Sequence, residues 1–308
     1  MHEFIKSNPA ACLLNLGANP QRQLIHGLEG IKAKLQAMQA AQSSNSSAST
    51  VRPACLITGA AVRLGKTIAQ AMSACGWDVA IHYRHSQSAA EDLAQALTQQ
   101  DRAAACFQSD LESAQAIGQL FNRVIGRFPR LSCIINNASQ FEFDRPETVS
   151  AALLESHTQT NLIAPVLLTR HLHEFLAPNH QHGQDPAGVV IHLLDQKLVN
   201  PNPDFFSYTV SKAALLEATR LCAAALAPVL RVVAIAPGIT LASADQTEAE
   251  FQKAHTMTPL GASSRPEEIA DAVVWLARAR AVTGTMLLVD GGQHLSPLPR
   301  DVMMMIRS

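Results

Sequence analysis

Two hydrophobic patterns alternate along the chain from residue 51 onward. Short continuous apolar runs predict buried strands, and segments with apolar residues every three or four positions predict amphipathic helices. The expected strands span 54–58, 78–83, 104–108, 131–136, 189–194, 231–236 and 285–289. The expected helices span 66–75, 89–97, 114–127, 151–176 and 266–278, with one more that carries Tyr208 in its first turns.

This alternation predicts a parallel sheet with helices on both faces, which is a doubly wound α/β (Rossmann-type) fold. Ligands of such folds bind beyond the carboxyl ends of the strands. We therefore interpret 51–308 as one domain and expect its functional residues in the loops that follow the strands.

Residues 1–50 have a different pattern. A helix is expected around 21–39, and the Ser- and Asn-rich stretch AQSSNSSAST follows at 41–50. Such a stretch has little apolar surface to bury and is typical of a flexible linker. We interpret 1–50 as an N-terminal extension and linker.

Composition excludes several classes of function. The chain has 24 Lys and Arg residues against 25 Asp and Glu residues, which argues against a sequence-independent nucleic-acid-binding protein. Six cysteines occur without a C-x-x-C pair, as expected for buried thiols in a reducing compartment. No apolar run approaches the length of a membrane span, and no signal-type segment follows the first residues. We expect a cytoplasmic protein that does not bind membranes.

Twelve histidines raise the question of a metal site. The pairs His171/His173 and His180/His182 alternate, and alternate residues on a helix point apart. No H-E-x-x-H motif or cysteine partner accompanies them, so no metal site is expected.

The first chemical candidate is the pair Tyr208 and Lys212, which lie four residues apart on one face of an expected helix. A neighbouring ammonium favours the phenolate, so the pKa of Tyr208 is expected to fall below about 10. Asp195 follows the strand 189–194 and could share a proton relay with the phenol. This arrangement suits general acid–base catalysis.

A second candidate is the glycine-rich turn from Thr58 to Gly65, between the first strand and its helix. Small residues there let backbone N–H groups approach a pyrophosphate. The second strand ends without the acidic residue that usually selects NAD, and its basic and hydroxyl residues suit a 2′-phosphate. NADPH is therefore the expected cofactor, with 110–111 and 136–139 near its adenine and nicotinamide ribose.

Several motifs in register resemble the short-chain dehydrogenase/reductase family. They are the glycine-rich turn, N-N-A at 136–138, Asn161, Tyr208-x-x-x-Lys212, Pro237-Gly238 and V-D-G-G at 289–292. The resemblance implies that Tyr208 donates a proton and that Lys212 binds the nicotinamide ribose and lowers the pKa of Tyr208. It further implies that Asn161 holds a water in the relay, and that a mobile lid follows Gly238.

Three departures from the common pattern resemble the pteridine reductase branch, which includes dihydromonapterin and alternative dihydrofolate reductases. Arg63 stands in the glycine turn, Asp195 replaces the usual serine, and Ser139 ends N-N-A-S. The resemblance implies that Phe141 stacks on a pterin, that Arg63 bridges cofactor phosphate and pterin, and that Ser139 bonds the pterin edge.

The expected site residues fall into three groups. The catalytic residues are Asp195, Tyr208, Lys212 and Asn161. The cofactor-binding residues are Gly59, Arg63, Leu64, Gly65, His82, Tyr83, Arg84, His85, Ser86, Asp110, Leu111, Asn137, Ala138, Ser139, Lys212, Pro237, Gly238 and Thr240. The substrate-binding residues are Arg63, Ser139, Phe141, Asp195 and Tyr208.

The function expected from these residues is NADPH-dependent reduction of dihydropterins or dihydrofolate to their tetrahydro forms. One alternative is a carbonyl reductase of the same family acting on a 3-oxoacyl thioester or a sugar, which Asp195 disfavours because a carboxylate repels developing negative charge. Another is a non-catalytic NADPH-sensing protein. The apolar C-terminal run Met303–Ile306 is expected to form a subunit contact in a homotetramer.

Overall fold

The computed structural model describes residues 52–99, 102–243 and 246–307. The helix expected at 21–39 and the linker expected at 41–50 lie outside the described residues. Residues from Arg52 onward form a compact unit of their own.

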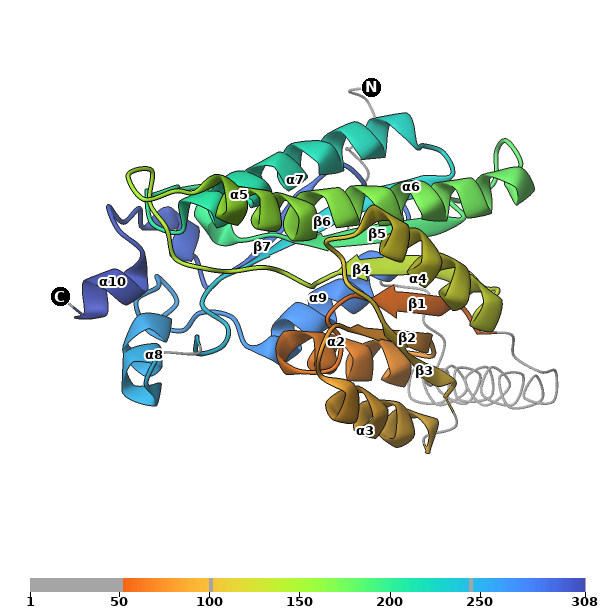
Figure 1. Cartoon of the computed structure of the whole chain (residues 1–308), viewed down its shortest axis with the longest axis horizontal. Helices are drawn as coiled ribbons and strands as arrows, with labels where there is room; N and C mark the ends of the chain where they lie inside the picture. The colour runs from red at the N-terminus through yellow and green to blue at the C-terminus, as the bar shows by residue number, and fades with distance from the viewer. Residues whose placement is uncertain (1–51, 100–101, 244–245, 308) are drawn as a thin grey trace, which may run out of the picture. The chain divides into compact units, whose positions relative to one another are not determined.

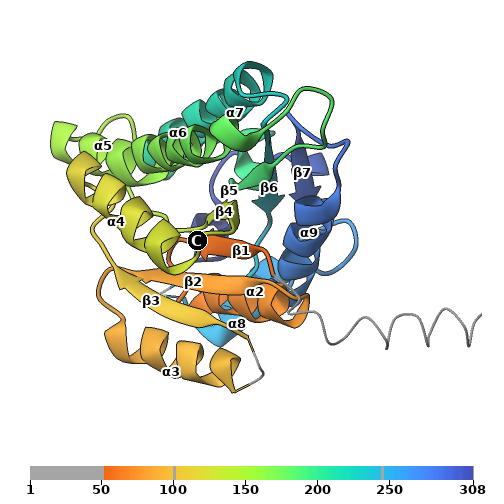
Figure 2. The same ribbon diagram turned by 90° about the vertical axis from the view of Figure 1, so that its right-hand side faces the viewer.

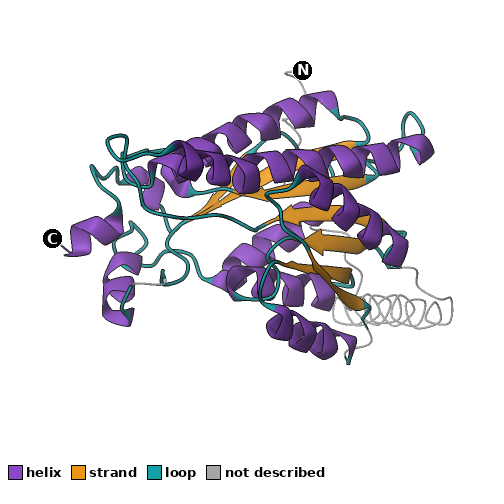
Figure 3. Ribbon diagram, viewed as in Figure 1, coloured by secondary structure: helices purple, strands orange, loops and turns teal. Residues whose placement is uncertain are grey.

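A seven-stranded parallel sheet forms the centre of this unit (Figure 3). Its strand order is β3-β2-β1-β4-β5-β6-β7. The order reverses between β1 and β4, which is where doubly wound folds bind ligands. The strands are β1 (Ala54–Ile57), β2 (Asp78–Tyr83), β3 (Ala104–Gln108), β4 (Leu131–Asn136), β5 (Gly188–Leu193), β6 (Leu230–Pro237) and β7 (Met286–Val289). The predicted fold class is confirmed.

Helices cover both faces of the sheet, as the turned view in Figure 2 shows. One layer contains α4 (Ala114–Arg127), α5 (Ala151–Thr158), α6 (Ala164–Leu176) and α7 (Phe206–Ala225). The other contains α2 (Arg63–Ala74), α3 (Gln87–Thr98) and α9 (Pro266–Arg278).

The two layers explain why the strands are apolar throughout. In β1, Ile57 packs into the hydrophobic cluster that includes Met72 of α2 and Val273 of α9. Its neighbour Leu56 packs into the opposite cluster, with Leu120 of α4. Successive residues of a strand point to opposite faces, so both faces need apolar side chains.

The prediction of one long helix at 151–176 is wrong. A π-helical turn at Gln159–Ile163 separates α5 from α6. This turn holds Asn161, whose side chain is fully buried and bonds to the loop after β4 and to α7. Insertion of a π turn at a functional residue is a recurrent feature of helices.

Two helices near the site follow no clear hydrophobic period and were not predicted. The first is α8 (Glu248–His255), which begins with a capping box between Thr247 and Glu250. The second is α10 (Val302–Arg307), which packs against α8 (Figure 1). None of the helices in the described part of the chain is long and apolar enough to cross a membrane.

Gly65, in the first turn of α2, gives a prediction about stability. An added Cβ would clash with the carbonyl oxygen of Gly59 and lie 2.7 Å from Nδ2 of Asn137. Gly65→Ala should therefore lower the free energy of unfolding by about 1–3 kcal/mol. Gly126→Ala is the matched control, because no atom lies within 4 Å of its added Cβ in α4. Urea unfolding should show a lower midpoint for Gly65→Ala and an equal or higher one for Gly126→Ala; equal midpoints for the two variants would contradict this packing.

Candidate active site

Two adjoining cavities open at the carboxyl ends of the strands, each of about 360 Å³. We call the first the tyrosine cavity, because Tyr208, Asp195 and Lys212 line it. We call the second the glycine cavity, because Gly59 and Gly65 line it. Four residues line both cavities: Arg63, Leu64, Asn137 and Ser139. Each cavity therefore lies where the fold predicts a ligand.

The glycine turn is fixed by side chains from the ends of β1 and β4. Nδ2 of Asn137 donates to the carbonyl oxygens of Thr58 and Gly59, at 2.9 and 3.2 Å. Oγ1 of Thr58 accepts the backbone N–H groups of Asn137 and Ala138, both at 3.0 Å. The N-cap of α2, Val62, makes no side-chain cap bond. The first N–H groups of α2 are thus open to an anionic ligand.

His82 has a different role from the one expected. Its ring is buried, accepts the N–H of Gly59 at Nδ1 (3.1 Å) and bonds the carbonyl oxygen of Ser109 through Nε2 (3.2 Å). Burial lowers the pKa of His82 to about 4, so the ring is neutral. The expectation of a cation at this position is wrong, and His82 instead braces the glycine turn.

The end of β2 places one cation at the glycine cavity. Arg84 lines it and forms ion pairs with Asp110 at 3.1 Å and Glu112 at 3.0 Å. Tyr83 packs against the core. Of the expected residues from His82 to Ser86, only His82 and Arg84 line the described cavity. Because the ring of His82 is neutral, Arg84 is the cation of this group that lies at the cavity.

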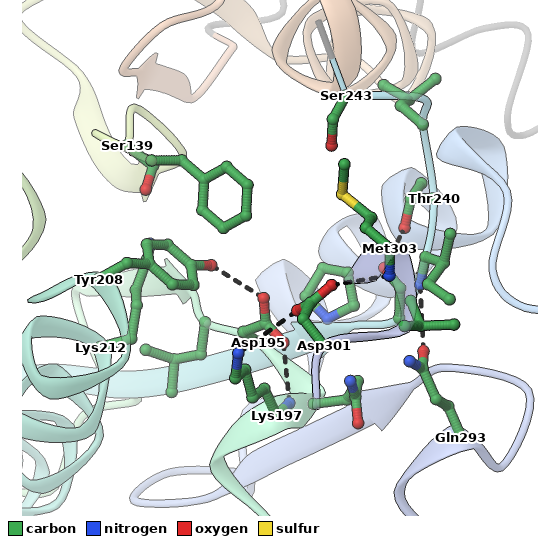
Figure 4. A pocket seen from close by; sticks show the side chains of 18 of the residues that line it. Ser139, Asp195, Lys197, Tyr208, Lys212, Thr240, Ser243, Gln293, Asp301 and Met303 are labelled. Carbon is green, nitrogen blue, oxygen red and sulfur yellow. Dashed lines mark hydrogen bonds and ion pairs between the residues drawn. The ribbon is translucent and has the colours of Figure 1, made fainter. Parts of the chain in front are cut away.

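The relay expected between Tyr208 and Asp195 is present as a direct hydrogen bond. The hydroxyl of Tyr208 donates to Oδ2 of Asp195 at 2.9 Å (Figure 4). The other oxygen of Asp195 accepts the backbone N–H of Lys197 at 2.8 Å. Tyr208 is buried and Asp195 is half-buried. Loss of water raises the pKa of Asp195, even though these two hydrogen bonds oppose the shift.

The expected effect of Lys212 on Tyr208 is wrong in this structure. Burial, together with the nearby Asp195 carboxylate, raises the pKa of Tyr208 well above its usual value. Nζ of Lys212 donates instead to the carbonyl oxygen of Leu193 at 2.7 Å, and it lies 5.7 Å from the centre of the Tyr208 ring. Burial lowers the pKa of Lys212 to about 8. Tyr208 is therefore a neutral phenol that holds its proton against a carboxyl group.

Asn161 uses all of its side-chain bonding capacity within the protein. Its Oδ1 accepts from the backbone N–H of Gln140 at 2.8 Å and from Oγ of Ser139 at 3.2 Å. Its Nδ2 donates to the carbonyl oxygen of Gln140 and to Oγ of Ser211, both at 3.0 Å. The structure thus gives Asn161 a positioning role, which joins the loop after β4 to the catalytic helix α7.

An aromatic group forms one wall of the tyrosine cavity. Phe141 stacks on Phe205, with ring centres 4.3 Å apart and planes 13° apart, and meets Tyr208 edge-on at 4.7 Å. The Phe141 side chain is 44% exposed, so ring surface is open to a ligand. Phe205 has a left-handed backbone (φ 55°), which is rare for a bulky residue and common at functional sites. Sequence reasoning missed Phe205; its only signal was the pair of phenylalanines just before the Tyr208 helix.

The remaining expected residues surround the junction of the two cavities. Arg63 reaches across it, and its Nη2 donates to the carbonyl oxygen of Ala242 at 2.8 Å. Thr240 bonds Oγ of Ser264 at 2.8 Å and lines the tyrosine cavity with Pro237 and Gly238. Asp110, Leu111 and Ala138 line the glycine cavity, as their positions at strand ends predict.

The C-terminal segment also lines the tyrosine cavity, which the sequence analysis did not predict. Val302 and Met303 are buried within their own chain and lie in the cavity wall with Arg300 and Asp301 (Figure 4). Met303 packs into its own chain, whereas Met305 is 36% exposed, so the expected subunit contact through Met303–Ile306 stays a prediction. In the described part of the chain, no group of three or more His, Cys, Asp or Glu side chains is arranged to hold a metal ion.

Comparison with known proteins gives consistent matches. A family model described as enoyl-(acyl carrier protein) reductase matches residues 59–294. Dihydromonapterin reductase of Enterobacter sp. (strain 638) is 32% identical over 242 residues, covering 78% of this chain and 96% of that protein. Pteridine reductase 1 of Leishmania tarentolae is 28% identical, covering 80% and 98%. The crystal structure of FolM alternative dihydrofolate reductase 1 from Brucella canis, complexed with NADP, is 35% identical, with a TM-score of 0.72 over 79% of this chain and 95% of that chain.

The buried ring of His82 predicts how stability depends on pH. Its pKa is about 4 in the folded protein and about 6.5 when unfolded. Its stabilising contribution is thus complete above about pH 6.5 and decreases as the pH falls toward 4. Between pH 7 and pH 5 the loss should be about 2 kcal/mol of unfolding free energy.

Urea unfolding at the two pH values tests this prediction. His82→Gln, which keeps a hydrogen-bonding side chain but cannot be protonated, should lose less stability on acidification than the wild type. His182→Gln, at an exposed position, is the control and should keep the wild-type dependence. An unchanged pH dependence in His82→Gln would mean that His82 is not the neutral brace described above.

Proposed function

The chain belongs to the short-chain dehydrogenase/reductase family, and from this premise we propose that it is an NADPH-dependent pteridine reductase. It reduces dihydropterins or dihydrofolate to their tetrahydro forms. The observation that carries the proposal is the partly buried Tyr208–Asp195 hydrogen bond beside the ring of Phe141. A proton donor for a ring nitrogen and a stacking surface for a flat ring thus lie in one cavity.

The glycine cavity fits a dinucleotide. Gly59 has a positive φ of 63°, Gly65 lies where any Cβ would clash, and the start of α2 lacks a side-chain cap. Backbone N–H groups can therefore approach a pyrophosphate closely. Arg84 at the rim is the candidate for the 2′-phosphate, for which it would exchange its exposed partners Asp110 and Glu112. NADPH, when bound, supplies the hydride.

The residues of the tyrosine cavity would supply the proton. The hydroxyl of Tyr208 donates its hydrogen bond to Asp195, and burial raises the pKa of this carboxyl group. A ring nitrogen that gains basicity during reduction can take the proton from Tyr208, and Asp195 can return one to it. Lys212 lines the same cavity and donates to the carbonyl oxygen of Leu193, and its ammonium would bind the nicotinamide ribose.

The substrate class follows from shape and polarity. The open part of the Phe141 ring suits a flat aromatic ligand, and aromatic rings prefer such stacked contacts. Ser139 and Arg63 stand at the junction of the cavities, where they can bond the polar edge of a pterin. The names of the relatives support the same class, since they include a dihydromonapterin reductase and a pteridine reductase.

A carbonyl reductase is the main alternative, and a relative named as a putative ketoacyl reductase is 29% identical. The carboxyl group of Asp195 disfavours it, because ketone reduction in the family usually relies on a serine hydroxyl beside the carbonyl oxygen. A protein that only senses NADPH is disfavoured by the direct contact between Tyr208 and Asp195.

The wider properties of the protein stay predictions. We propose that 1–50 form an extension to the reductase domain and that the protein is a cytoplasmic homotetramer. Exposed apolar side chains on two helices, Leu221 of α7 and Trp275 of α9, support self-association.

Turnover assays test the function directly. Oxidation of NADPH, followed at 340 nm, should be observed with dihydromonapterin, dihydrobiopterin or dihydrofolate and be absent with acetoacetyl thioester. Tyr208→Phe should lower turnover at least about 100-fold, the usual contribution of general acid catalysis, with NADPH affinity nearly unchanged. If only the thioester is turned over, the pterin assignment is refuted, while the assignment to the family still holds.

The cofactor preference depends on Arg84. Arg84→Met should raise the KM for NADPH by about 10-fold or more, as expected for loss of a charge-assisted bond to phosphate, and change the KM for NADH little. Arg170→Met, on the exposed surface of α6, is the control and should leave both constants unchanged. If the ratio of the two KM values is the same in Arg84→Met and wild type, Arg84 does not bind the 2′-phosphate.

A further inference from the structure

A buried lysine stands behind Asp195, and nothing in the mechanism above uses its charge. Lys197 follows β5 in a short 3-10 helix, and its side chain is 6% exposed. Its Nζ donates to the backbone carbonyl oxygen of Asp204 at 2.6 Å and forms an ion pair with Asp301 at 3.3 Å. A buried ammonium is costly unless it is paired, so these contacts hold Lys197 in one place.

The same lysine contacts the catalytic acid through its backbone. Its N–H donates to Oδ1 of Asp195 at 2.8 Å, while Oδ2 of Asp195 accepts from Tyr208 (Figure 4). Lys197 therefore touches Asp195 with its main chain and Asp301 with its side chain. One residue connects the proton donor to a segment more than 100 positions further along the chain.

The C-terminal segment is fixed at this point by a second buried acid. The side chain of Asp204 is fully buried and accepts from Nη1 of Arg145 (3.1 Å), Nε of Arg300 (2.7 Å) and the N–H of Asp301 (2.8 Å). Although burial opposes it, the Arg300 guanidinium helps hold the pKa of Asp204 below its usual value. The C-terminal wall, which we define as residues 300–303, is thus tied to the loop that precedes α7.

Lys197 also lies close to Phe205, the residue with a left-handed backbone that stacks on Phe141. Asp204 directly precedes Phe205, and Nζ of Lys197 lies 5.4 Å from the centre of the Phe205 ring. By bonding the carbonyl oxygen of Asp204, Lys197 restrains the backbone where it enters the left-handed conformation of Phe205. Lys197 therefore contacts both the segment that carries Phe205 and the C-terminal wall.

The charges that face Asp195 come from three elements. Lys197 lies on the 3-10 helix after β5, Tyr208 and Lys212 on α7, and Asp301 on the C-terminal wall. Burial is the main cause of the raised pKa of Asp195; Lys197 lowers this pKa and Asp301 raises it. Lys197 and Asp301 thus shift the pKa of Asp195 in opposite directions, and the two shifts offset each other.

From this geometry we propose that Lys197 is a positioning residue that ties the C-terminal wall to Asp195, closing the tyrosine cavity and balancing the charge that faces the proton donor. The proposal rests on the proposed function, because Asp195 matters only if it shares its proton with Tyr208 during reduction. It assigns the final segment of the chain a role in shaping the substrate cavity and in the pH range of the reaction.

The pH dependence of kcat for the best pterin substrate tests the proposal. The donor pair must carry its proton, so turnover decreases as the pH rises through the apparent pKa of the pair. Lys197→Met removes a cation beside Asp195 and should move this decrease to higher pH. Asp301→Asn removes an anion and should move it to lower pH. Each shift should be about half a pH unit or more, which is about threefold in rate on the falling limb.

The double variant Lys197→Met/Asp301→Asn should return the decrease toward its wild-type position, because the two opposing charges are both absent. Amide hydrogen exchange of residues 300–307 should be faster than in wild type in both single variants and in the double variant, because the tie is broken in each. Arg220→Met is the control. It breaks an exposed ion pair with Glu217 on α7, about three turns beyond Tyr208. It should change neither the pH dependence of kcat nor the amide exchange of residues 300–307.

The outcomes separate this proposal from the proposed function. Shifts in the same direction, or faster exchange without any shift, would reduce Lys197 to a structural residue and overturn the proposal. If the wild type turns over no pterin, the proposed function fails, and exchange at 300–307 still decides whether Lys197 ties the wall. If Lys197→Met does not fold, Asp301→Asn carries the test alone, and an unshifted profile with unchanged exchange refutes the tie.

Discussion

The site depends on one partly buried hydrogen bond between a phenol and a carboxyl group, from Tyr208 to Asp195. Three local structures must meet for it to form: the end of β5, the 3-10 helix after it, and the first turn of α7. Burial raises the pKa of both partners. The fold thus places a phenol hydroxyl and a carboxyl group in direct contact in the wall of the tyrosine cavity.

The protein holds this pair by restraining α7 at its start. The carboxylate of Asp144 accepts the backbone N–H and the hydroxyl of Ser207, directly before Tyr208. Asn161 in its π turn connects Ser211, one turn further, to the loop that carries Phe141. Each contact uses a buried polar group, and such groups are stable only when fully bonded. These contacts join the loop that carries Phe141 to the start of the helix that carries Tyr208.

The sequence predicted what depends on local pattern and on position along the sheet. The strands, the cofactor turn and the contact of Asp195 with Tyr208 follow from apolar runs and from the rule that parallel strands end at one edge. The π turn at Asn161 was missed because a helical period continues across it. The charge of His82 and the direction of the Tyr208 pKa shift were mispredicted, because protonation depends on burial, which the sequence alone does not give.

The C-terminal wall was beyond sequence reasoning for a further reason. Residues 300–303 reach the site through Asp204 and Lys197, contacts that span about 100 positions and follow no period. Such long-range polar contacts form only after the sheet has brought β5 and the chain end together. Their charges nevertheless act on Asp195, because a buried site screens them weakly. The last segment of the chain therefore belongs to the active site as much as the glycine turn does, although only the turn carries a recognisable motif.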